Sequence, residues 1–600
     1  MLNPEELKKI YAARHVLDSD LERTLGVQIP FDAYLQDPLV AEEDPMFGFD
    51  KNIYIQWEPG FADGPTSARF AVVDYNGDTE TFIPPAKWSS DKQKYEKDGQ
   101  MLDCNNAGFL QFHQVNVWVA VQRGLRFYQE GNGLGRTIPW GFEGNRLIIL
   151  PHAGNCENAF YDRRSKSLQF YYFGPQDKRV YTCLSADIIN HEFGHAVLDG
   201  IRPYYLESNS VQTAAFHEFI GDMTAILILL RNNQFRRKLA EKTKGNLNNA
   251  DQLAFIAEEF GRTVKDRPYL RNAREKTTLS EVQDDDRPHY VSQVLTGAMY
   301  KILVSLSEHY LKVRNETPLQ AYWNAIQRMQ HTAIQPLDLL PPVDVTFKDY
   351  ALAVLRYEEL TNPKDPYGYF SKMLNIFREY EILDDQDVKK LNQPDYLYKR
   401  LDLSVYYDMR YVAQSRSAAY DFLNDNRKVL YIPSNQDFIV SDLYDAFKLT
   451  REGQRLPREI VIEYIWKEEV KLDGWEFGYL NGKLTTMLCG GTLVYDEYGT
   501  LLSWFRKPGT QLSMGKDYEK ENIIGSKRRS EFLANIAHRV KNGQFGIDHG
   551  SDRGFLGSRT TPLTMKTTNG IVNLELSPHM SLEEEDADYN TGGRKWQISF

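Results

Sequence analysis

The segment SADIINHEFGHAVLDG, which begins at Ser185, constrains the fold most because it combines a helix signal with a metal-ligand spacing. Ser185 can cap the start of a helix, and Gly200 can end it. His191 and His195 are four residues apart, so a helix places both rings on one face, about 6 Å apart. That spacing suits two imidazoles on one Zn²⁺ ion at ~2.0–2.1 Å. Glu192 lies about 100° further round the helix, where it can reach a water in an open coordination position.

The next predicted helix, about 211–230, supplies a third ligand. A catalytic zinc ion takes three protein ligands and keeps one position open, so two histidines are not enough. Glu218 is the natural third ligand, and Asp222, one turn further on, can accept the outer N–H of a ligating histidine. Zinc lowers the pKa of its water from about 15.7 toward ~7, so a carboxylate can take the proton. H-E-x-x-H arises by chance about once or twice per hundred chains of this kind, and the alternative is a pair of surface histidines.

These two segments resemble the zinc-ligand segments of the thermolysin-like metallopeptidases, the gluzincin clan. The resemblance covers about residues 105–310, roughly a third of the chain. It implies that His191, His195 and Glu218 are the zinc ligands, that Glu192 is the general base, and that Asp222 is the partner of His191. It also implies one zinc ion per chain and a two-lobe α+β core, β-rich in its N-terminal lobe and helical in its C-terminal lobe.

The resemblance extends to three flanking segments, ENAFY, DDDRPHY and PYLRNA. ENAFY is similar to the family's edge strand, on which the substrate backbone pairs as an added strand, so Asn158 and Ala159 would hold the peptide. DDDRPHY resembles the family's Asp-x4-His before a helix, so His289 would stabilise the transition state and Asp284 would orient it. PYLRNA resembles the segment lining the pocket after the scissile bond, where Arg271 would bond the substrate carbonyl.

Two features depart from the family's pattern. The family has a tyrosine between the ligand segments that donates to the oxyanion, but the loop here is longer; of Tyr204 and Tyr205, we expect Tyr205 to take this role. Secreted members of the family bind calcium near the second zinc helix. Asp187 matches one of those calcium ligands, whereas Leu229 stands in place of another, so calcium is not expected.

The chain divides into four regions by its patterns. Residues 1–45 indicate a helix and an acidic, proline-containing arm, 46–180 the β-rich lobe, and 181–392 the helical lobe with the zinc site. Residues 393–600 indicate an additional C-terminal α/β domain of unknown role, because alternating apolar residues over 458–504 predict a β meander.

Composition narrows the classes of partner. The formal net charge of -12 disfavours nucleic acid and anionic membrane as partners. Four scattered cysteines are too few for a disulfide framework, and no apolar run approaches the ~18 residues of a membrane span. We therefore expect a cytoplasmic protein. The metallopeptidase resemblance implies a protein or peptide substrate, and the C-terminal region of unknown role could bind a regulatory partner.

Three features have simpler interpretations. GNGLG, which starts at Gly131, lacks the third glycine of a dinucleotide fingerprint and is expected to be a loop. His217 directly precedes Glu218 and is expected on the helix surface. Cys156 is expected to be structural rather than nucleophilic.

The sequence predicts a zinc-dependent endopeptidase and leaves two alternatives open. A zinc aminopeptidase would need a group to grip a free N-terminus, and no motif for that lies near the zinc helices. A latent or non-proteolytic zinc-binding scaffold would need four protein ligands that close the metal site. Substitution of Glu192 distinguishes a scaffold from a peptidase, because it would leave a scaffold unaffected and would abolish the activity of a peptidase.

Overall fold

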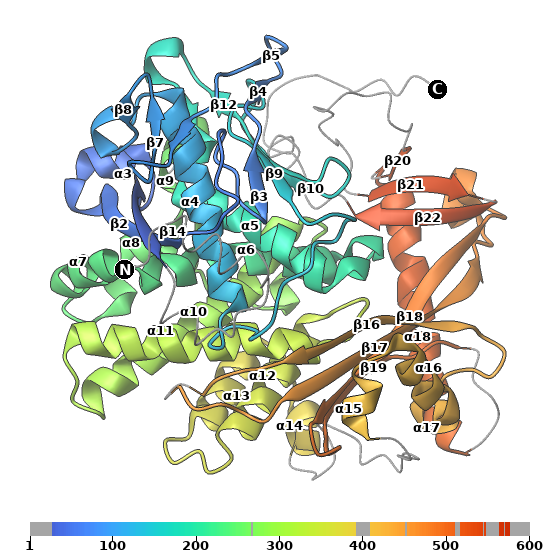
Figure 1. Cartoon of the computed structure of the whole chain (residues 1–600). Helices are drawn as coiled ribbons and strands as arrows, with labels where there is room; N and C mark the ends of the chain where they lie inside the picture. Colours follow the sequence, from blue (N-terminus) through green and yellow to red (C-terminus); the bar gives the residue numbers. More distant parts are fainter. Residues whose placement is uncertain are drawn as a thin grey trace.

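The computed structural model describes residues 27–265, 268–391, 408–450, 453–510, 516–543, 545–547, 563–568 and 570–576. Over these residues the chain is a mixed helix-and-strand fold, so the α+β prediction is confirmed at this level. Figure 1 shows the N-terminal strands (blue) at upper left, the long helices (green to yellow-green) below them, and the C-terminal sheet (orange to red) at the right. The domain boundary predicted near residue 392 and the helix predicted for the first residues lie outside the described part.

The separate arm predicted for residues 1–45 is wrong for the residues that the structure describes. β1 (Gln28–Tyr34) pairs in antiparallel fashion with β2 (Phe49–Gln56), and α3 (Pro38–Glu43) lies between them. Ile29 and Phe31 are buried because every second side chain of β1 faces the core. The acidic residues that indicated an arm belong to the turn around α3.

The rest of the N-terminal lobe consists of short strands around one long helix. The helix, α4 (Leu110–Gln129), carries apolar residues spaced by three and four. Strands β10, β11, β9 and β3 form one sheet in that order, so β10 lies at an edge. The strand bounds are β3 (Phe70–Val72), β4 (Tyr75–Asn76), β5 (Thr81–Phe82), β6 (Lys87–Ser89), β7 (Lys94–Lys97), β8 (Gln100–Met101), β9 (Leu147–Leu150), β10 (Ala159–Asp162), β11 (Ser167–Phe170), β12 (Tyr172–Phe173) and β13 (Val180–Tyr181).

The next region is mainly helical, and the two helices predicted there, the one after Ser185 and the one at about 211–230, are confirmed. Ser185 caps α5 through its side chain, which accepts a hydrogen bond from the backbone N–H of Ile188. The helices and short strands are α5 (Ala186–Ile201), α6 (Val211–Arg231), α7 (Asn233–Thr243), α8 (Asp251–Ala254), β14 (Phe255–Ile256), α9 (Glu258–Lys265), β15 (Arg271–Asn272), α10 (Pro288–Lys312), α11 (Pro318–Ile334), α12 (Phe347–Thr361), α13 (Tyr369–Glu379) and α14 (Asp385–Leu391).

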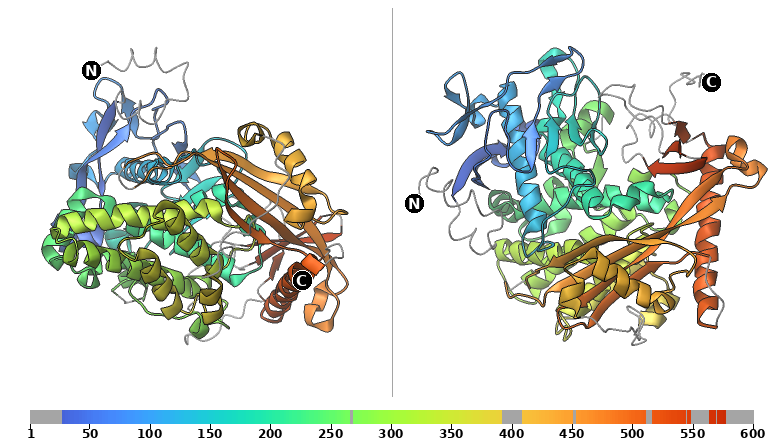
Figure 2. Two further views of the ribbon diagram at one scale, coloured as in Figure 1. Left: turned by 90° about the horizontal axis from the view of Figure 1, so that it is seen from below. Right: turned by 45° about the vertical axis from the view of Figure 1, so that its right-hand side comes forward.

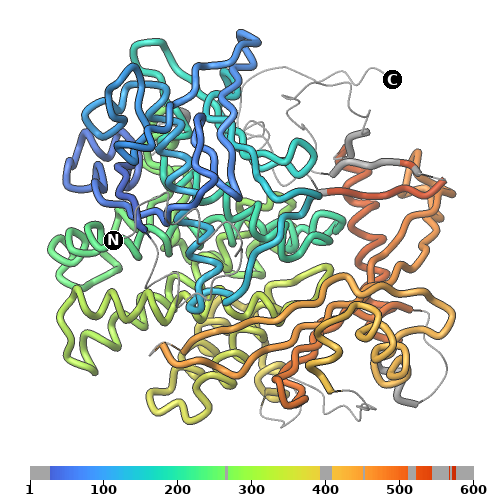
Figure 3. Tube along the Cα trace, in the orientation of Figure 1, coloured from blue at the N-terminus to red at the C-terminus, as the bar shows by residue number. Residues whose placement is uncertain are grey.

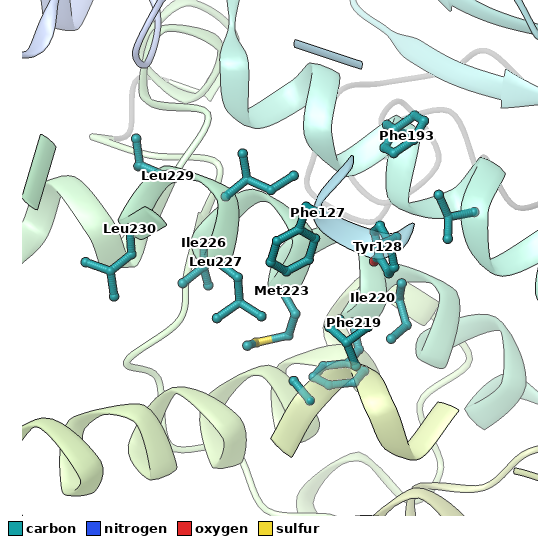
Figure 4. Packing of buried hydrophobic residues seen from close by; sticks show 14 of the residues in the cluster. Phe127, Tyr128, Phe193, Phe219, Ile220, Met223, Ile226, Leu227, Leu229 and Leu230 are labelled. Atoms are coloured by element: carbon teal, nitrogen blue, oxygen red, sulfur yellow. The ribbon is translucent and has the colours of Figure 1, made fainter. Parts of the chain in front are cut away.

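Helix α6 runs through the centre of the core. Figure 4 shows apolar side chains of α6, among them Phe219 and Met223, packed with Phe127 and Tyr128 of α4. In the described part of the chain, α6 alone is long and apolar enough to cross a membrane, but its apolar stretch is entirely buried. Its hydropathy is therefore that of a core helix.

Two glycines allow α5 and α6 to approach closely. A Cβ on Gly194 would lie 3.0 Å from the Cα of Gly221, and a Cβ on Gly221 would lie 2.5 Å from Nδ1 of His191. A larger side chain at Gly194 would meet the backbone of α6, and one at Gly221 would meet the ring of His191. The close contact brings the residues of α6 against the histidine face of α5.

The C-terminal region contains the predicted meander. β17 (Glu459–Lys471), β18 (Leu484–Asp496) and β19 (Leu501–Lys507) pair in antiparallel order. They belong to a seven-stranded sheet that also includes β16 (Phe438–Ala446), β20 (Phe545–Ile547), β21 (Leu563–Thr568) and β22 (Ile571–Leu576). The helices of this region are α15 (Met409–Val412), α16 (Arg416–Asp425), α17 (Arg427–Leu430) and α18 (Lys516–Lys541).

This sheet packs on the helical core through buried charges. Asp338, fully buried, binds Arg136 at 2.8 Å and Lys448 at 2.9 Å, and Lys448 also binds Glu459 of β17 at 2.7 Å. Arg202, just after α5, forms an ion pair with Glu463 of β17. In both views of Figure 2 the orange sheet lies directly beside the green helices.

The glycine-rich loop is a docking point for the same region. Backbone N–H groups of Phe447 and Leu449 donate to the carbonyls of Gly135 and Gly131. Gly135 has a φ of +63°, and a Cβ there would lie 2.3 Å from the carbonyl oxygen of Phe447. Figure 3 shows this light-blue loop reaching the orange tube. The segment is therefore a loop, as predicted, and its glycines permit a close backbone contact.

Candidate functional site

The candidate metal centre lies where α5 crosses α6. Nε2 of His191 and Nε2 of His195 lie 3.1 Å apart. On α6, Oε2 of Glu218 lies 3.2 Å from Nε2 of His191, and Oε1 lies 3.5 Å from Nε2 of His195. All three side chains are buried, and their donor atoms lie within 4.8 Å of one another.

These separations fit a zinc ion. Two donors at ~2.0–2.1 Å from a tetrahedral zinc ion are about 3.3–3.4 Å apart. The three observed donor–donor distances, 3.1, 3.2 and 3.5 Å, lie on either side of that value. Two imidazole nitrogens and one carboxylate oxygen are a donor set that zinc takes in catalytic sites. The residues that the sequence predicts as ligands therefore meet in the right geometry to hold the metal.

A second layer of contacts fixes the ring of His191. Oδ1 of Asp222 lies 3.1 Å from Nδ1 of His191, on the opposite side of the ring from Glu218. Nη2 of Arg271 lies 2.9 Å from Oδ1 of Asp222 and 3.1 Å from Nδ1 of His191. Burial and Arg271 lower the pKa of His191, but Asp222 and Glu218 outweigh them and raise it. Burial also disfavours the charged Glu218, yet His289 and His195 hold the pKa of that carboxyl well below its usual range.

Glu192 faces the pocket from the same helix. Its Oε2 accepts a hydrogen bond of 3.2 Å from the backbone N–H of Tyr161 in β10. Burial raises the pKa of Glu192 to about 8, while the neighbouring His191 opposes that rise. The carboxylate is thus held beside the metal ligands without being one of them, which is the position that a general base requires.

A pocket opens on this centre. Its volume is about 540 Å³ including its open mouth. Asn158 and Ala159 line it where β10 begins, so the edge of the sheet borders the pocket as the sequence predicts. The residues that line it are Asn158, Ala159, Thr182, Ile188, His191, Glu192, His195, Ile256, Ala257, Phe260, Leu270, Arg271 and His289.

Part of this lining was missed by the sequence prediction. Ile256, Ala257 and Phe260 form an apolar wall from β14 and the start of α9. They come from a short strand and a short polar helix, which have no motif. The antiparallel pairing of β14 with β15 places them beside Arg271, and only the structure shows that pairing.

His289 reaches the centre from a third element. It is the second residue of α10, and its Nε2 lies 3.0 Å from Oε2 of Glu218. Asp284, which was expected to orient His289, is exposed in the turn before α10. Oε2 of Glu218 lies at Nε2 of His289 in this structure, and the role of Asp284 in orienting His289 stays a prediction.

Tyr205 does not reach the pocket, and its predicted role as an oxyanion donor is wrong in this structure. It lies in a short 3-10 helix (Pro203–Glu207), is fully buried, and its hydroxyl donates to the carbonyl of Pro341 at 2.8 Å. Tyr204 packs against Val343 and Ile465 instead. The long connection between α5 and α6 turns toward the C-terminal sheet, which carries both tyrosines away from the metal ligands.

His217 also differs from its prediction. It is only 2% exposed, not a surface residue, and its ring centre lies 5.9 Å from that of His195. Burial lowers the pKa of His217 to about 4, so the ring is neutral near pH 7. The helix-surface prediction failed because α6 is covered on all sides.

The acid that matched a calcium ligand also lies in the interior. Oδ2 of Asp187 accepts from the backbone N–H of Ala257 at 3.5 Å, and burial raises the pKa of Asp187 to about 8. Leu229 is buried in the apolar core.

Comparison with models of known protein families gave no match, and comparison with curated protein sequences gave none either.

Proposed function

We propose that this protein is a zinc-dependent endopeptidase with a thermolysin-like catalytic core. The observation that carries the proposal is the arrangement of His191, His195 and Glu218 at zinc-binding separations, with Glu192 beside them in an open pocket. A paired-helix centre of this composition, with the HEFGH and HEFIGD segments, resembles that of the gluzincin clan.

The edge strand is the proposed site for the substrate backbone. β10 pairs with β11 on one side, and its start borders the pocket on the other. An extended peptide can add to such an edge as a further strand, with its side chains pointing alternately into the pocket. Asn158 and Ala159 would then hold the peptide, and the backbone pairing would place a carbonyl over the metal ligands.

Zinc, Glu192, His289 and Arg271 each have a proposed role in amide hydrolysis. Zinc, when bound, lowers the pKa of a water molecule and polarises the scissile carbonyl. Glu192 takes the proton of the attacking water and delivers it to the leaving nitrogen, as a general base and then a general acid. His289 and Arg271 line the same pocket and supply donors for the oxyanion and for the next carbonyl.

The lining favours an endopeptidase over an aminopeptidase. Glu192 is the one acid among the described lining residues, and it is assigned to proton transfer. A free N-terminal ammonium group would therefore find no second carboxylate to bind. The apolar wall of Ile188, Phe260 and Leu270 favours a large apolar side chain after the scissile bond.

We also propose a cytoplasmic location and a regulatory role for the C-terminal region. The four cysteines form no disulfide, as expected in a reducing compartment. No residue of the described C-terminal segments, from 408 onward, lines the pocket. Regulation through this region would then act through the buried contacts with the core rather than by covering the site.

The test is digestion of a mixed peptide library, read by mass spectrometry, with wild type beside Glu192→Gln at equal zinc content. The proposal expects internal cleavage before large apolar residues by wild type and at least a hundredfold slower cleavage by the variant. Removal of single N-terminal residues would favour the aminopeptidase. Zinc in both proteins with cleavage by neither would overturn the proposal in favour of a zinc-binding scaffold.

A further inference from the structure

A second cluster of metal-ligand side chains lies in the N-terminal lobe. His113 is on α4, His152 follows β9, and Cys183 lies in a 3-10 helix (Thr182–Leu184) before α5. One donor atom from each lies within 4.8 Å of the others. All three are at most 2% exposed, so this is an interior cluster separate from the pocket.

The residues around this cluster orient His152 in the way that supporting residues orient a histidine ligand of a metal. Nδ1 of His152 lies 2.9 Å from Oδ1 of Asp74, and Oδ2 of Asp74 accepts from Gln114 at 2.7 Å. The carboxylate therefore fixes the ring and turns Nε2 of His152 toward Nδ1 of His113, 2.9 Å away. A carboxylate that holds the outer nitrogen of a histidine is the usual support of a histidine ligand.

The surroundings of the cluster are buried and hold its residues by ring contacts and hydrogen bonds. The ring of Tyr181 lies against both imidazoles, with ring centres 4.7 Å from His113 and 5.5 Å from His152. The backbone carbonyl of Cys183 accepts from Asn116 of α4 at 3.0 Å, which fixes the thiol-bearing turn. An environment that excludes water strengthens the binding of an ion by thiolate and imidazole.

We propose that His113 Nδ1, His152 Nε2 and Cys183 Sγ form a second zinc site, distinct from the catalytic centre. Two imidazoles and a thiolate suit zinc, whereas magnesium and calcium prefer oxygen donors. Three protein donors leave one position for a water molecule. The inference goes beyond the proposed peptidase activity and does not depend on it.

The location gives the second zinc a positioning role. Thr182, next to Cys183, lines the substrate pocket, and Ser185 caps the helix that carries the catalytic ligands. A metal on Cys183 would tie this turn to α4 and to the end of β9. Because the unfolded chain has no such preformed site, the binding free energy would stabilise the folded lobe.

The competing explanation is a metal-free chain of hydrogen bonds from Asp74 through His152 to His113. The 2.9 Å separation of the two ring nitrogens is compatible with a hydrogen bond as well. The two accounts differ on Cys183, which has no function in the hydrogen-bonded chain and is a ligand in the metal site.

Metal analysis of the full chain distinguishes them. We expect two zinc ions per chain in wild type, one in Cys183→Ser, one in Glu218→Gln and none in the double variant. Cys489→Ser is the matched control, because Cys489 is another fully buried cysteine in a different core, and it should retain both ions.

Cobalt replacement gives a first readout on the wild-type chain, before any variant is made. Cobalt bound by a thiolate absorbs strongly in the near ultraviolet, and the catalytic centre has no sulfur ligand. Cobalt-loaded wild type should show this band, Cys156→Ser should keep it, and Cys183→Ser should lose it. One metal ion per wild-type chain, with no thiolate band in the cobalt protein, would overturn the proposal.

Discussion

At the scale of single residues, the ring of His191 in the candidate centre is fixed by Asp222, which does not line the pocket, and by Arg271, which does. Asp222 is buried on α6 and lies on the far side of the His191 ring from Glu218. Arg271 binds both Asp222 and His191, so the ring is held from two directions. The orientation of the first ligand therefore depends on residues one layer away.

Asp222→Asn should weaken zinc binding by about 10- to 100-fold, because the outer nitrogen of His191 loses its charged partner. Competition with a calibrated chelator measures this change. Asp284→Asn is the control. Asp284 is exposed, so this variant should bind zinc with the affinity of wild type. Equal zinc affinity of Asp222→Asn and wild type would remove the positioning role of Asp222.

Some residues of the candidate site could be predicted from the sequence, and others could not. His191, His195 and Glu218 could be predicted because a helical repeat of four and a neighbouring helix are local signals. Tyr205 could not be placed, because its position depends on how the 203–207 turn packs on Pro341. Cys183 and its histidine partners could not be grouped either, because they come from separate parts of the sequence and no spacing joins them.

At the scale of elements, the site depends on how closely α5 and α6 approach. Gly194 and Gly221 face each other at the crossing, and a side chain on either would meet backbone or ligand atoms. The helices themselves followed from apolar periodicity and from the Ser185 cap. The crossing of α5 and α6 could not be predicted, because periodicity shows which face of a helix is buried but not which element packs against that face.

Gly221→Ala should lower zinc occupancy and peptidase activity at least tenfold while leaving most of the fold intact. The added Cβ would lie 2.5 Å from Nδ1 of His191, so the ring must turn away from the metal position. Zinc analysis and circular dichroism on the same sample check this. Gly108→Ala is the control, because a Cβ there meets nothing within 4 Å; full zinc binding by Gly221→Ala would contradict the account.

Helix α9 supplies a prediction about pH. Burial, with Asp37 and Glu42, raises the pKa of Glu259 to about 8, against about 4.3 in an unfolded chain. The folded state therefore binds a proton that the unfolded state has lost, so this group's contribution to stability falls as pH rises from about 4.3 to about 8. Glu259→Gln should reduce the loss of thermal stability between about pH 6 and 8.

The control for that pH series is Glu241→Gln, which changes an exposed residue on α7. Its unfolding temperature should follow the pH dependence of wild type. If Glu259→Gln followed wild type equally closely, Glu259 would not be a buried titrating group in solution.

At the scale of the whole molecule, the C-terminal sheet has its own apolar cluster and also contributes residues to the core of the helices. Val461, Val494 and Phe505 of the sheet belong to the same apolar core as the helices. The meander could be predicted from alternating residues, but not its docking. The docking uses a glycine-rich loop and buried charges that lie more than a hundred residues apart.

Asp338→Asn should destabilise the entire protein by about 3–5 kcal/mol, because Arg136 and Lys448 remain buried and lose a shared carboxylate. Asp63→Asn breaks an exposed ion pair with Lys87 and should lower the free energy of unfolding by about 0–1 kcal/mol. Denaturant unfolding measures both. Separate transitions for the two regions in wild type would contradict a single cooperative core.

The measurement that tests the account most directly is an anomalous difference map at the zinc absorption edge, from crystals of the wild-type chain. We expect a peak bonded to His191, His195 and Glu218, with Glu192 outside bonding distance and one position open toward the pocket. No peak among these three residues in zinc-containing protein would contradict the account. So would a fourth protein ligand that closes the site, since a closed site cannot admit a substrate.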